Sequence, residues 1–584
     1  MSKMKKMLAC MLCISMCVSA GCGKSNVPDT AGGTNVSDAG TASADAGTDG
    51  GRLDNFNLDG TLPIVKDPSK MEPIKIATVI GAESTVPTAE KEMTKKIMED
   101  TGIPIEWQEI PADGSAEKIN LMLTSGEYPD VFWNGISMDM AVQYSDQDIF
   151  IPTEDLIDQY APKLAAIFED HPEYRQGSTT PNGHSYGFPY IEEMFGLVRT
   201  PGPFMINQEW LKKVGKEVPT TVDEFVDCLR AFKEAGDLNG NGVADEVPYA
   251  LEFGNSNGFG SYDSFYFFTG AFGLADSVCS GNPMADHLRL LDGKITFAAT
   301  EDAFRKTCDF FHDMYAEGLL DADSFAPSGT GNPLYISKLA QPEAVVGAFQ
   351  CWTPRDNLVD LSVREQYVAI PRLTGPEGKC GNVLNYSEMQ DTSMVAITDK
   401  CEYPEVIAAL VNYCMDPEIS ITLNWGAIGY TYVKGDDGVL HFNLDENGEI
   451  ILQNGWQYFS EQRNNTSPCR GSLVVLNEYY DKYADYTWDA VPILEGQRVN
   501  GKEECLAEIE SVPKMMLSLE ENNKLSQIYG TIANIVNAYQ MDAVMNGTDD
   551  AGWNKFKEDL KAAGVDELVS VYQQAYDRYC SFAE

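Results

Sequence analysis

Basic residues are scarce in this chain of 584 residues, which has 42 Lys and Arg against 89 Asp and Glu and a formal net charge of −47. Proteins that bind nucleic acids need a basic surface that neutralises phosphates. We therefore expect no nucleic-acid partner. The acidity does not identify a ligand, because net charge mainly governs solubility and non-specific association.

Closely spaced cysteine pairs are missing from the body of the chain. Of the 14 cysteines, four lie at or before Cys22, and the other ten are scattered from Cys228 to Cys580 without a CxxC pair. This spacing gives no support to a zinc-finger or thioredoxin-like site. We expect most of these cysteines to be small buried hydrophobic residues, and their disulfide pairing stays open.

Long hydrophobic runs are absent after residue 20, so the sequence predicts no membrane-spanning helix there. Before that point, Lys3, Lys5 and Lys6 precede an apolar run that ends at Ala20-Gly21-Cys22. A charged start and a short apolar core predict an export signal over residues 1–21. The alternative for Cys22 is an incidental cysteine after an ordinary signal.

The segment that follows is rich in Gly, Ala, Ser, Thr and Asp and has almost no large apolar residues as far as Gly51. Such a composition cannot bury a core and predicts a flexible tether, which we place over residues 22–70. The N-terminus resembles that of bacterial lipoproteins. This resemblance implies that Cys22 carries the lipid that anchors the protein to the outer face of the cell membrane.

Strands and helices alternate at the start of the body. The segment Ile74–Ile80 alternates apolar residues, a charged helical pattern covers 89–100, and a second strand is expected over 103–110. Another helical pattern over 117–125 leads to a third strand at 130–133. This order predicts βαβ units with a parallel sheet, whose ligands gather at the carboxyl ends of the strands.

Later segments predict further helices and one strand. Thr221 and Glu224 have the spacing of a capping box, which predicts a helix from there to about residue 235. Helical periodicity recurs over 304–317, and residues 344–349 have the pattern of a buried strand. The stretch 514–582 is mostly helical, with an interruption at 546–552.

Several of these segments, in this order, resemble the extracellular solute-binding proteins of ABC transporters, and more narrowly their long lipoprotein and alginate-binding type. The segments that carry the resemblance are Lys118–Leu123, Tyr128–Val131, Tyr186–Pro189, Asn207–Leu211, Pro219–Thr221 and Gln574–Tyr579. The resemblance implies a two-lobed α/β fold with parallel-sheet lobes and a helical C-terminal region. It also implies a ligand cleft between the lobes and ABC permease subunits as partners.

The expected organisation follows from this resemblance and from the element pattern. We expect the chain to pass between the lobes more than once. After the signal and the tether, the expected parts are 71–195 in lobe 1, 196–340 in lobe 2 with a calcium loop, 341–400 returning to lobe 1, and 401–584 as a largely helical part of both lobes.

Side-chain oxygens recur in the segment Asp237–Glu246. Asp, Asn, Asn and Asp stand at loop positions one, three, five and nine, with Gly at six, as at the start of an EF-hand-type calcium loop. Pro248 stands at position twelve, where Glu is expected. By resemblance to the alginate-binding type, Glu246 supplies the late carboxylate and Val243 a backbone carbonyl. The predicted ligands of a structural calcium ion are Asp237, Asn239, Asn241, Val243, Asp245 and Glu246. The alternative is an Asn-Gly turn held by side-chain caps.

Catalytic motifs have little support. Gly254–Gly258 matches G-x-S-x-G, but Gly258-Phe259-Gly260-Ser261 continues as a loop, whereas a nucleophile elbow turns straight into a helix. No HExxH or P-loop motif is present. A glycosidase needs only two suitably placed carboxylates, so sequence alone leaves that class open.

Aromatic residues at the ends of predicted elements are candidates for stacking on sugar rings, with polar neighbours that can bind hydroxyl groups. Trp133 is followed by Asn134, Trp352 lies near Arg355, and Asn424 precedes Trp425. The alternative for each ring is a place in the core. The candidate ligand-binding residues are Glu83, Trp133, Asn134, Tyr190, Arg199, Trp352, Arg355 and Trp425.

Together these features predict a non-enzymatic, exported and lipid-anchored substrate-binding protein of an ABC importer, acting as a monomer on an oligosaccharide. The alternatives are a surface polysaccharide-degrading enzyme and a solute sensor with the same fold.

Overall fold

The computed structural model describes residues 51–253, 263–278, 283–325, 333–354, 358, 360–446, 448–468, 473–485 and 490–582. The chain divides into two units, residues 1–53 and 54–584, and the second contains all of the elements below. The predicted signal peptide, Cys22 and the motif Gly254–Gly258 lie outside the described residues.

The folded unit begins earlier than the predicted tether ends. Phe56 and Val65 form an antiparallel bridge, and both side chains are buried. The ring of Phe56 contacts that of Tyr403 edge to face, with 4.9 Å between centroids. The prediction of a tether over residues 22–70 is therefore wrong for residues 54–70. Their apolar side chains give the segment surface to bury, which the preceding Gly- and Ser-rich tract lacks.

The first lobe is built on a six-stranded sheet with the order β14-β4-β11-β3-β1-β2. The pairs β1–β2 and β1–β3 are parallel, as predicted from the βαβ pattern. Strand β11 is antiparallel to both β3 and β4, because the chain enters it from the other lobe rather than through a crossover helix. The strands are β1 (Ile74–Ile80), β2 (Ile105–Pro111), β3 (Val131–Trp133), β4 (Phe188–Glu192), β11 (Met389–Ile397) and β14 (Val474–Val475).

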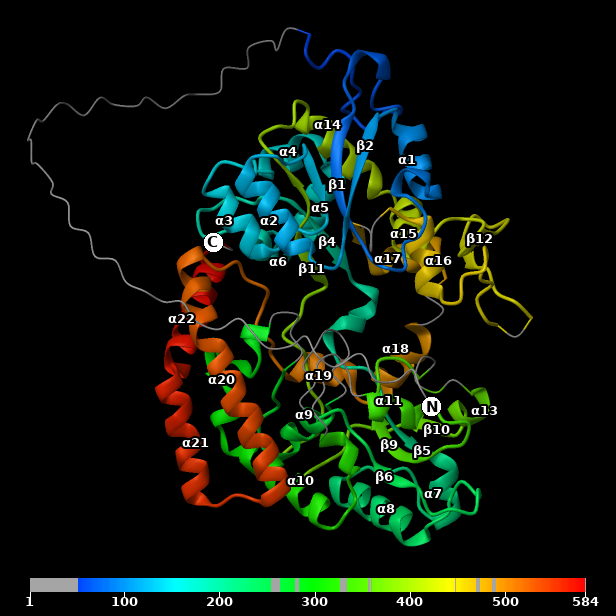
Figure 1. The fold of residues 1–584 in the computed structure, drawn as a ribbon, viewed down its shortest axis with the longest axis vertical. Coiled ribbons are helices and arrows are strands. Elements are labelled where there is room, and N and C mark those ends of the chain that lie inside the picture. Colours follow the sequence, from blue (N-terminus) through cyan, green and yellow to red (C-terminus); the bar gives the residue numbers. More distant parts are fainter. Residues whose placement is uncertain are drawn as a thin grey trace, which may run out of the picture. The chain divides into compact units, whose positions relative to one another are not determined.

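Helices surround this sheet (Figure 1), and α3 and α6 pack directly on β11. The helices of the first lobe are α1 (Glu92–Thr101), α2 (Ser115–Ser125), α3 (Met138–Ser145), α4 (Glu154–Tyr160), α5 (Pro162–Asp170), α6 (Pro172–Ser178), α14 (Pro404–Cys414), α15 (Pro417–Trp425), α16 (Phe459–Thr466) and α17 (Asn477–Tyr483). A small hairpin of β12 (Tyr432–Lys434) and β13 (Leu440–Phe442) lies between α15 and α16 in the sequence.

The second lobe is built on a four-stranded sheet with the order β10-β5-β9-β6. Its strands are β5 (Phe204–Asn207), β6 (Val247–Tyr249), β9 (Val346–Gln350) and β10 (Tyr367–Ala369). The predicted return to the first lobe over residues 341–400 is thus too early, because β9 and β10 remain in the second sheet and only β11 returns. The pairing of β9 with β6 and β5 depends on contacts between distant segments, which the local pattern does not contain.

Helices α8 and α10 of the second lobe confirm predictions from the sequence. Thr221 and Glu224 form the predicted capping box at the start of α8. The helices are α7 (Gln208–Val214), α8 (Val222–Ala235), α9 (Phe265–Thr269), α10 (Asp302–Ala316), α11 (Pro333–Leu339), α13 (Leu361–Arg364), α18 (Ala490–Val499), α19 (Lys502–Glu508), α20 (Leu519–Asn546), α21 (Asp550–Ala563) and α22 (Val565–Ser581). A second hairpin consists of β7 (Leu288–Leu291) and β8 (Lys294–Phe297).

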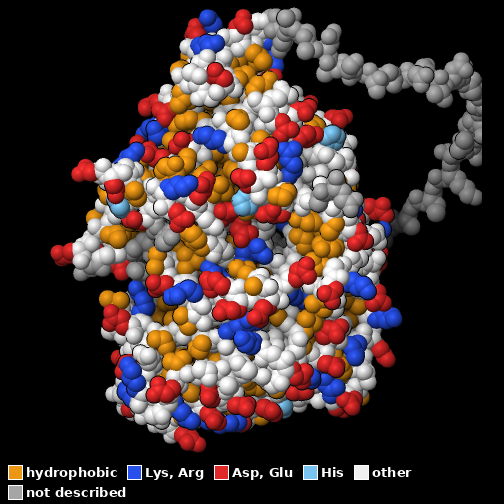
Figure 2. Space-filling view, turned by 180° about the vertical axis from the view of Figure 1, so that it is seen from behind, with side chains coloured by type: hydrophobic (Ala, Val, Ile, Leu, Met, Phe, Trp, Pro, Cys, Tyr) orange, Lys and Arg blue, Asp and Glu red, His pale blue; other side chains and the backbone are white. Residues whose placement is uncertain are grey.

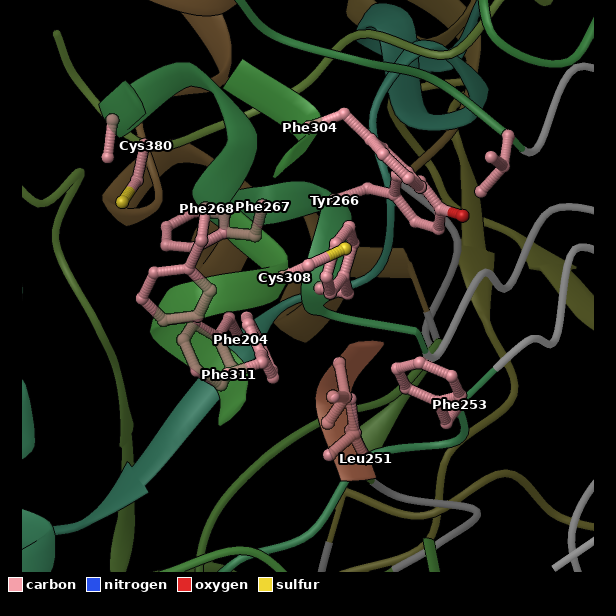
Figure 3. Close-up of a cluster of buried hydrophobic side chains, with 14 of the residues drawn as sticks. Phe204, Leu251, Phe253, Tyr266, Phe267, Phe268, Phe304, Cys308, Phe311 and Cys380 are labelled. Atoms are coloured by element: carbon pink, nitrogen blue, oxygen red, sulfur yellow. The ribbon is translucent and has the colours of Figure 1, made fainter. Parts of the chain in front are cut away.

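The core of the second lobe is dominated by aromatic rings. Figure 3 shows Phe204, Phe268 and Phe311 gathered together, and the ring centroids of Phe268 lie 5.8 Å from Phe204 and 5.6 Å from Phe311. Cys308 is fully buried in the same cluster. The thiols of Cys228, Cys308, Cys380 and Cys505 are free and buried, as expected for small hydrophobic residues.

The three C-terminal helices α20–α22 lie side by side (Figure 1) and extend this core. Phe556 of α21 stacks on Phe304 of α10, with ring centroids 6.2 Å apart. The predicted helical C-terminal region is confirmed, and the break between α20 and α21 falls within the predicted interruption.

Among the described residues, no single helix is long and apolar enough to cross a membrane, and only the pair α14–α15, bent by 86°, passes that test jointly. On the face shown in Figure 2, acidic and basic side chains are interspersed. The described residues of this face therefore form no extended basic patch of the kind that nucleic acids require.

Candidate functional site

A cleft with a cavity of about 430 Å³ lies where elements of the two lobes meet. Its walls come from β4, β11, α15 and α16 of the first lobe, from the short helical segment Met194–Arg199 that follows β4, and from α18 and the end of β9 in the second lobe. Binding sites for small molecules commonly have this size, about 300–1,000 Å³. The lining residues are Tyr190, Glu192, Met194, Leu197, Val198, Trp352, Gln390, Trp425, Arg463, Ala490 and Ile493.

Three of the predicted ligand-binding residues meet in this cleft. Tyr190 lies on β4, Trp352 follows β9 by two residues, and Trp425 is the last residue of α15. The first and third belong to the first lobe and Trp352 to the second. The cleft therefore has aromatic side chains on both lobes.

A buried polar network supports the cleft from the first-lobe side. The carboxylate of Glu192 accepts one hydrogen bond from the Tyr480 hydroxyl, at 3.0 Å, and another from the Asn424 side-chain amide. The indole Nε1 of Trp425 donates to the Tyr480 hydroxyl at 2.8 Å, and Nη2 of Arg463 donates to Asn424 Oδ1 at 2.9 Å. These bonds connect five side chains from four elements. Tyr190 joins the network through a hydrogen bond of 3.3 Å from its hydroxyl to Asn424 Oδ1.

Glu192 is the most strongly perturbed acid of the cleft. It is only 4% exposed. Burial raises its pKa from 4.5 to about 8, although hydrogen bonds from Tyr480 and Asn424 and the charge of Arg463 act in the opposite direction. A carboxyl group with such a pKa changes its charge near neutral pH, as groups at functional sites often do.

Trp425 presents little open surface to a ligand. Its side chain is 7% exposed, and the guanidinium of Arg463 lies over its ring, 4.5 Å from the centroid. Phe459 is parallel to the indole, with ring centroids 6.3 Å apart. Trp425 lines the cleft, but the cation of Arg463 covers a face that a sugar ring would need.

Trp133 and Asn134 do not reach the cleft. Trp133 is 2% exposed and packs near Trp107, so its predicted role as a stacking platform is not supported and we assign it to the core. Asn134 exchanges two hydrogen bonds with the backbone of Val79, at 2.7 and 3.1 Å, and so extends the pairing of β3 with β1. The strand end was misread because β11 covers β3 on the other side, and that pairing is not visible locally.

The other candidates lie outside the lining of the cleft. Arg199 forms an ion pair of 3.1 Å with Glu388 and donates to Ser511, which links crossing segments of the chain. Glu83 accepts a hydrogen bond of 3.0 Å from Asn464 and so holds the loop after β1 against α16. Arg355 lies outside the described residues.

Sequence reasoning missed Glu192, Gln390 and Arg463, all of which line the cleft. Glu192 is the last residue of β4 and lies three residues after the segment Tyr186–Pro189, which is only a weak local signal. Arg463 lies on a short polar helix, where nothing in the sequence marks it. Its partner Asn424 had been noted only as a neighbour of Trp425.

In the loop Asp237–Glu246, side-chain oxygens accept hydrogen bonds from backbone amides of the same loop. The Asp237 carboxylate accepts hydrogen bonds from the amides of Gly240 and Gly242, at 2.7 and 2.9 Å. Glu246 Oε1 accepts from the amide of Asn239 at 2.7 Å, while Glu246 Oε2 is buried without a hydrogen-bond partner. A buried carboxylate oxygen of this kind usually meets a cation, a water or a donor.

The residues of this loop fit a calcium ion by their chemistry. Their donors are carboxylate, amide and backbone oxygens, which hard cations prefer. Among the described residues, however, no group of three or more His, Cys, Asp or Glu side chains is arranged to hold a metal ion. The fit rests on Glu246 Oε2 and on the mixture of carboxylates with the amides of Asn239 and Asn241.

Comparison with known proteins matches residues 82–330 to the model of the bacterial extracellular solute-binding proteins. The chain is 29% identical over 539 residues to the fructooligosaccharide ABC transporter substrate-binding protein FusA of Streptococcus pneumoniae, covering 90% of this chain and 93% of FusA. It is 26% identical over 396 residues to the lipoprotein LipO of Bacillus subtilis, covering 65% and 71% of the two chains.

Solved structures agree with this relationship. FusA in complex with kestose superposes with a TM-score of 0.70 at 27% identity, over 87% of this chain and all of the FusA chain in that structure. An EF-hand mutant of FusA, in complex with fructo-nystose, superposes with a TM-score of 0.69 at the same identity. An HMO-binding solute-binding protein of Bifidobacterium longum infantis shares the fold, with a TM-score of 0.72 at 21% identity over 87% and 99% of the two chains. The two-lobed α/β fold is thus confirmed, and the similarity to FusA agrees with the predicted resemblance to the solute-binding proteins of ABC transporters.

Proposed function

We propose that this chain, a relative of the bacterial extracellular solute-binding proteins, is the substrate-binding subunit of an ABC importer and captures an oligosaccharide in its cleft. The observation that carries this proposal is the lining of the cleft, where aromatic and polar side chains from both lobes surround a cavity of about 430 Å³. FusA, a relative over most of the chain, is named for binding fructooligosaccharides.

The cleft suits a sugar for physical reasons. Pyranose and furanose rings have apolar C–H surfaces that pack on aromatic rings, and Tyr190 and Trp352 supply such rings from opposite lobes. Hydroxyl groups need donors and acceptors, which Glu192, Gln390 and Arg463 provide. A ligand that contacts both lobes binds the closed arrangement best, and so favours closure by its differential affinity.

The same lining favours binding over hydrolysis. A glycosidase uses two carboxyl groups about 5–10 Å apart on either side of the scissile bond. Glu192 is the single Asp or Glu among the lining residues of the cleft that the structure describes. We therefore propose that the protein is not an enzyme. We also propose that it delivers its ligand to permease subunits as a monomer.

Calorimetry against a panel of neutral oligosaccharides tests this function, with kestose as the first probe. We expect a one-to-one complex with kestose or another panel member, and a loss of affinity of about 1–3 kcal/mol in Trp352→Ala. The matched control is Tyr458→Ala, which removes an aromatic ring that is 64% exposed and lies outside the cleft lining. Binding of peptides with no sugar bound would contradict the substrate class, and hydrolysed sugar would support the enzyme alternative.

We also propose that Cys22 is the lipid-bearing N-terminus of the mature protein. LipO, a relative over 65% of this chain, is named a lipoprotein. The protein should then fractionate with the membrane, and Cys22→Ala should release it into the soluble fraction. Retention of Cys22→Ala on the membrane would contradict the anchor.

A structural calcium ion in the loop is the third part of the proposal. One of the solved FusA structures is that of an EF-hand mutant, which supports a comparable loop in that relative. The ion would be held by the oxygens of Asp237, Asn239, Asn241, Val243, Asp245 and Glu246. It would stabilise the loop and would take no part in ligand binding.

A further inference from the structure

We propose that Glu192 and Arg463 recognise hydroxyl groups of one sugar unit in the cleft, and that Trp425 and Tyr480 position these two side chains instead of stacking on the sugar. This inference rests on the proposed function and assigns roles within the same site. It differs from the expectation that Trp425 is a stacking platform.

The first step is the unused hydrogen-bonding capacity of the two side chains. The carboxyl group of Glu192 accepts two hydrogen bonds, from Tyr480 and Asn424, which leaves acceptor positions and, in the protonated form, one O–H donor for a further partner. A guanidinium has five N–H donors, and Arg463 makes one hydrogen bond, to Asn424. No carboxylate lies within 4.0 Å of Arg463 among the described residues, and Asn424 bridges it to Glu192. Both side chains line the cavity, so those of their remaining donors and acceptors that face it can bind hydroxyl groups there, whereas Nε of Arg463 is buried.

The second step concerns the direction of the hydrogen bonds behind them. The indole N–H of Trp425 is a donor only, so the Tyr480 oxygen must accept it at 2.8 Å. The single proton of the Tyr480 hydroxyl is then directed to Glu192. The hydrogen bond from Trp425 therefore sets the orientation of the Tyr480 hydroxyl, and the hydrogen bond from Tyr480 sets the position of one carboxyl oxygen of Glu192.

The third step is the contact between Trp425 and Arg463. The guanidinium lies 4.5 Å from the centroid of the indole ring, which holds the cation by its π-face. Trp425 thus contacts Arg463 directly through its ring and reaches Glu192 only through Tyr480, which accepts its N–H. With 7% of its surface exposed, it has little area left for a sugar.

Conservative variants test these roles, with kestose, or the tightest neutral oligosaccharide of the panel, as the probe. Tyr480→Phe removes only the hydroxyl group that lies between Trp425 and Glu192. Trp425→Phe keeps an aromatic ring but removes the indole N–H. The matched control is Tyr479→Phe, on the same helix, which removes a buried hydroxyl that donates to the Met415 carbonyl at 3.1 Å. Calorimetry gives the dissociation constant of each variant, and thermal unfolding reports its stability.

We expect Tyr480→Phe and Trp425→Phe each to weaken binding about tenfold, since each breaks the series of buried hydrogen bonds from Trp425 through Tyr480 to Glu192. The double variant should bind only slightly more weakly than either single variant, because residues of one network are not additive. Tyr479→Phe should bind within about twofold of the wild type at a comparable loss of stability. Glu192→Gln and Arg463→Met should weaken binding at least as much as Tyr480→Phe.

A pH profile separates positioning from a general structural role. The Tyr480 hydrogen bond lowers the pKa of Glu192, and the facing charged groups, Arg463 and Glu193, are unchanged in Tyr480→Phe. The pH at which the affinity for kestose changes should therefore move upward in Tyr480→Phe and not in Tyr479→Phe.

The outcomes distinguish the two proposals. If no neutral oligosaccharide binds the wild type, the proposed function fails and this inference fails with it. If the sugar binds but Tyr480→Phe and Trp425→Phe bind it as the wild type does, the function stands and the positioning role is overturned. A loss on Trp425→Ala that Trp425→Phe fully restores would show that Trp425 acts as a stacking platform after all.

Discussion

The cleft and the loop Asp237–Glu246 both gather polar side chains, but over very different distances along the chain. In the loop, Asp237 binds amides three and five residues away. In the cleft, Glu192 binds Tyr480 and Asn424, which lie 288 and 232 residues away. The loop is therefore a local structure whose side chains are mostly exposed, apart from the buried Glu246 Oε2, whereas the cleft depends on segments of both lobes that are far apart in the sequence.

This difference predicts how each region responds to change. The polar side chains behind the cleft are buried and share hydrogen bonds, so the removal of one leaves several polar groups with fewer partners. Side chains of the loop are largely exposed, and water replaces lost hydrogen bonds there. We expect the cleft to be sensitive to single substitutions and the loop to be sensitive to the loss of an ion.

Asn424→Ala should have the largest effect. Asn424 is fully buried and holds Glu192, Arg463 and Tyr190 together, so its removal should lower the free energy of unfolding by about 3 kcal/mol. Denaturant unfolding measures this change. The control Asn412→Ala removes a buried amide that accepts one hydrogen bond, from the Lys163 amide, and should cost about 1 kcal/mol. Equal losses of unfolding free energy in the two variants would mean that the network contributes no more to stability than a single buried hydrogen bond.

Removal of calcium should have the next largest effect. An ion that binds only the folded state adds about 2.7 kcal/mol when its concentration is 100 times the dissociation constant. EDTA should therefore lower the melting temperature of the wild type, and added calcium should restore it. Glu246→Gln should abolish this response, because it replaces the buried, unpartnered oxygen and removes its charge.

The control for the calcium experiment is Glu224→Gln, which alters the capping box of α8 close to the loop in sequence. It should lose some stability and keep the full response to EDTA. A wild-type protein that melts identically with EDTA and with calcium, and contains no metal, would rule out the ion.

Glu192→Gln should alter the pH dependence of stability. The pKa of Glu192 is about 8 in the folded protein against 4.5 for an ordinary Glu, so the folded state binds the extra proton between these values. Stability from this group is complete below pH 4.5 and is lost as the pH rises through about 8. The fall in melting temperature of the wild type from pH 5 to pH 8 should be smaller in Glu192→Gln.

Glu521→Gln is the control with the opposite sign. Burial alone would raise the pKa of Glu521, but hydrogen bonds from Arg578 and Ser518 lower it. Its contribution to stability is present above the unfolded pKa and is lost as the pH falls through the folded pKa. This variant should alter stability below about pH 5 and leave the range from 5 to 8 as in the wild type. An unchanged slope in Glu192→Gln would show that its carboxyl group is ionised throughout this range.

The same contrast between local contacts and contacts of distant segments explains which features the sequence could predict. The first βαβ units, the capping box at Thr221 and the C-terminal helices depend on periodicity and on residues a few positions apart, so local patterns were sufficient. The order β4-β11-β3, and with it the burial of Trp133, depends on strands that are far apart in the chain. The return point to the first lobe was misplaced for the same reason.

The candidate site was only partly predictable. Tyr190, Trp352 and Trp425 were found because aromatic residues at element ends are visible in the sequence. Glu192 and Arg463 were not, because a single acid or base among many gives no signal until the fold brings it to a cavity. The role of Trp425 also required the structure, since only there is Arg463 seen to cover its ring.

A crystal structure of the protein with kestose, or with the tightest neutral oligosaccharide of the panel, tests the central claim most directly. The account predicts one sugar unit in the cleft between Tyr190 and Trp352, with its hydroxyl groups bonded to Glu192 and Arg463 and with Arg463 still covering Trp425. Sugar bound away from these residues would contradict the proposed site, and a sugar ring stacked on Trp425 in place of Arg463 would contradict the roles assigned within it.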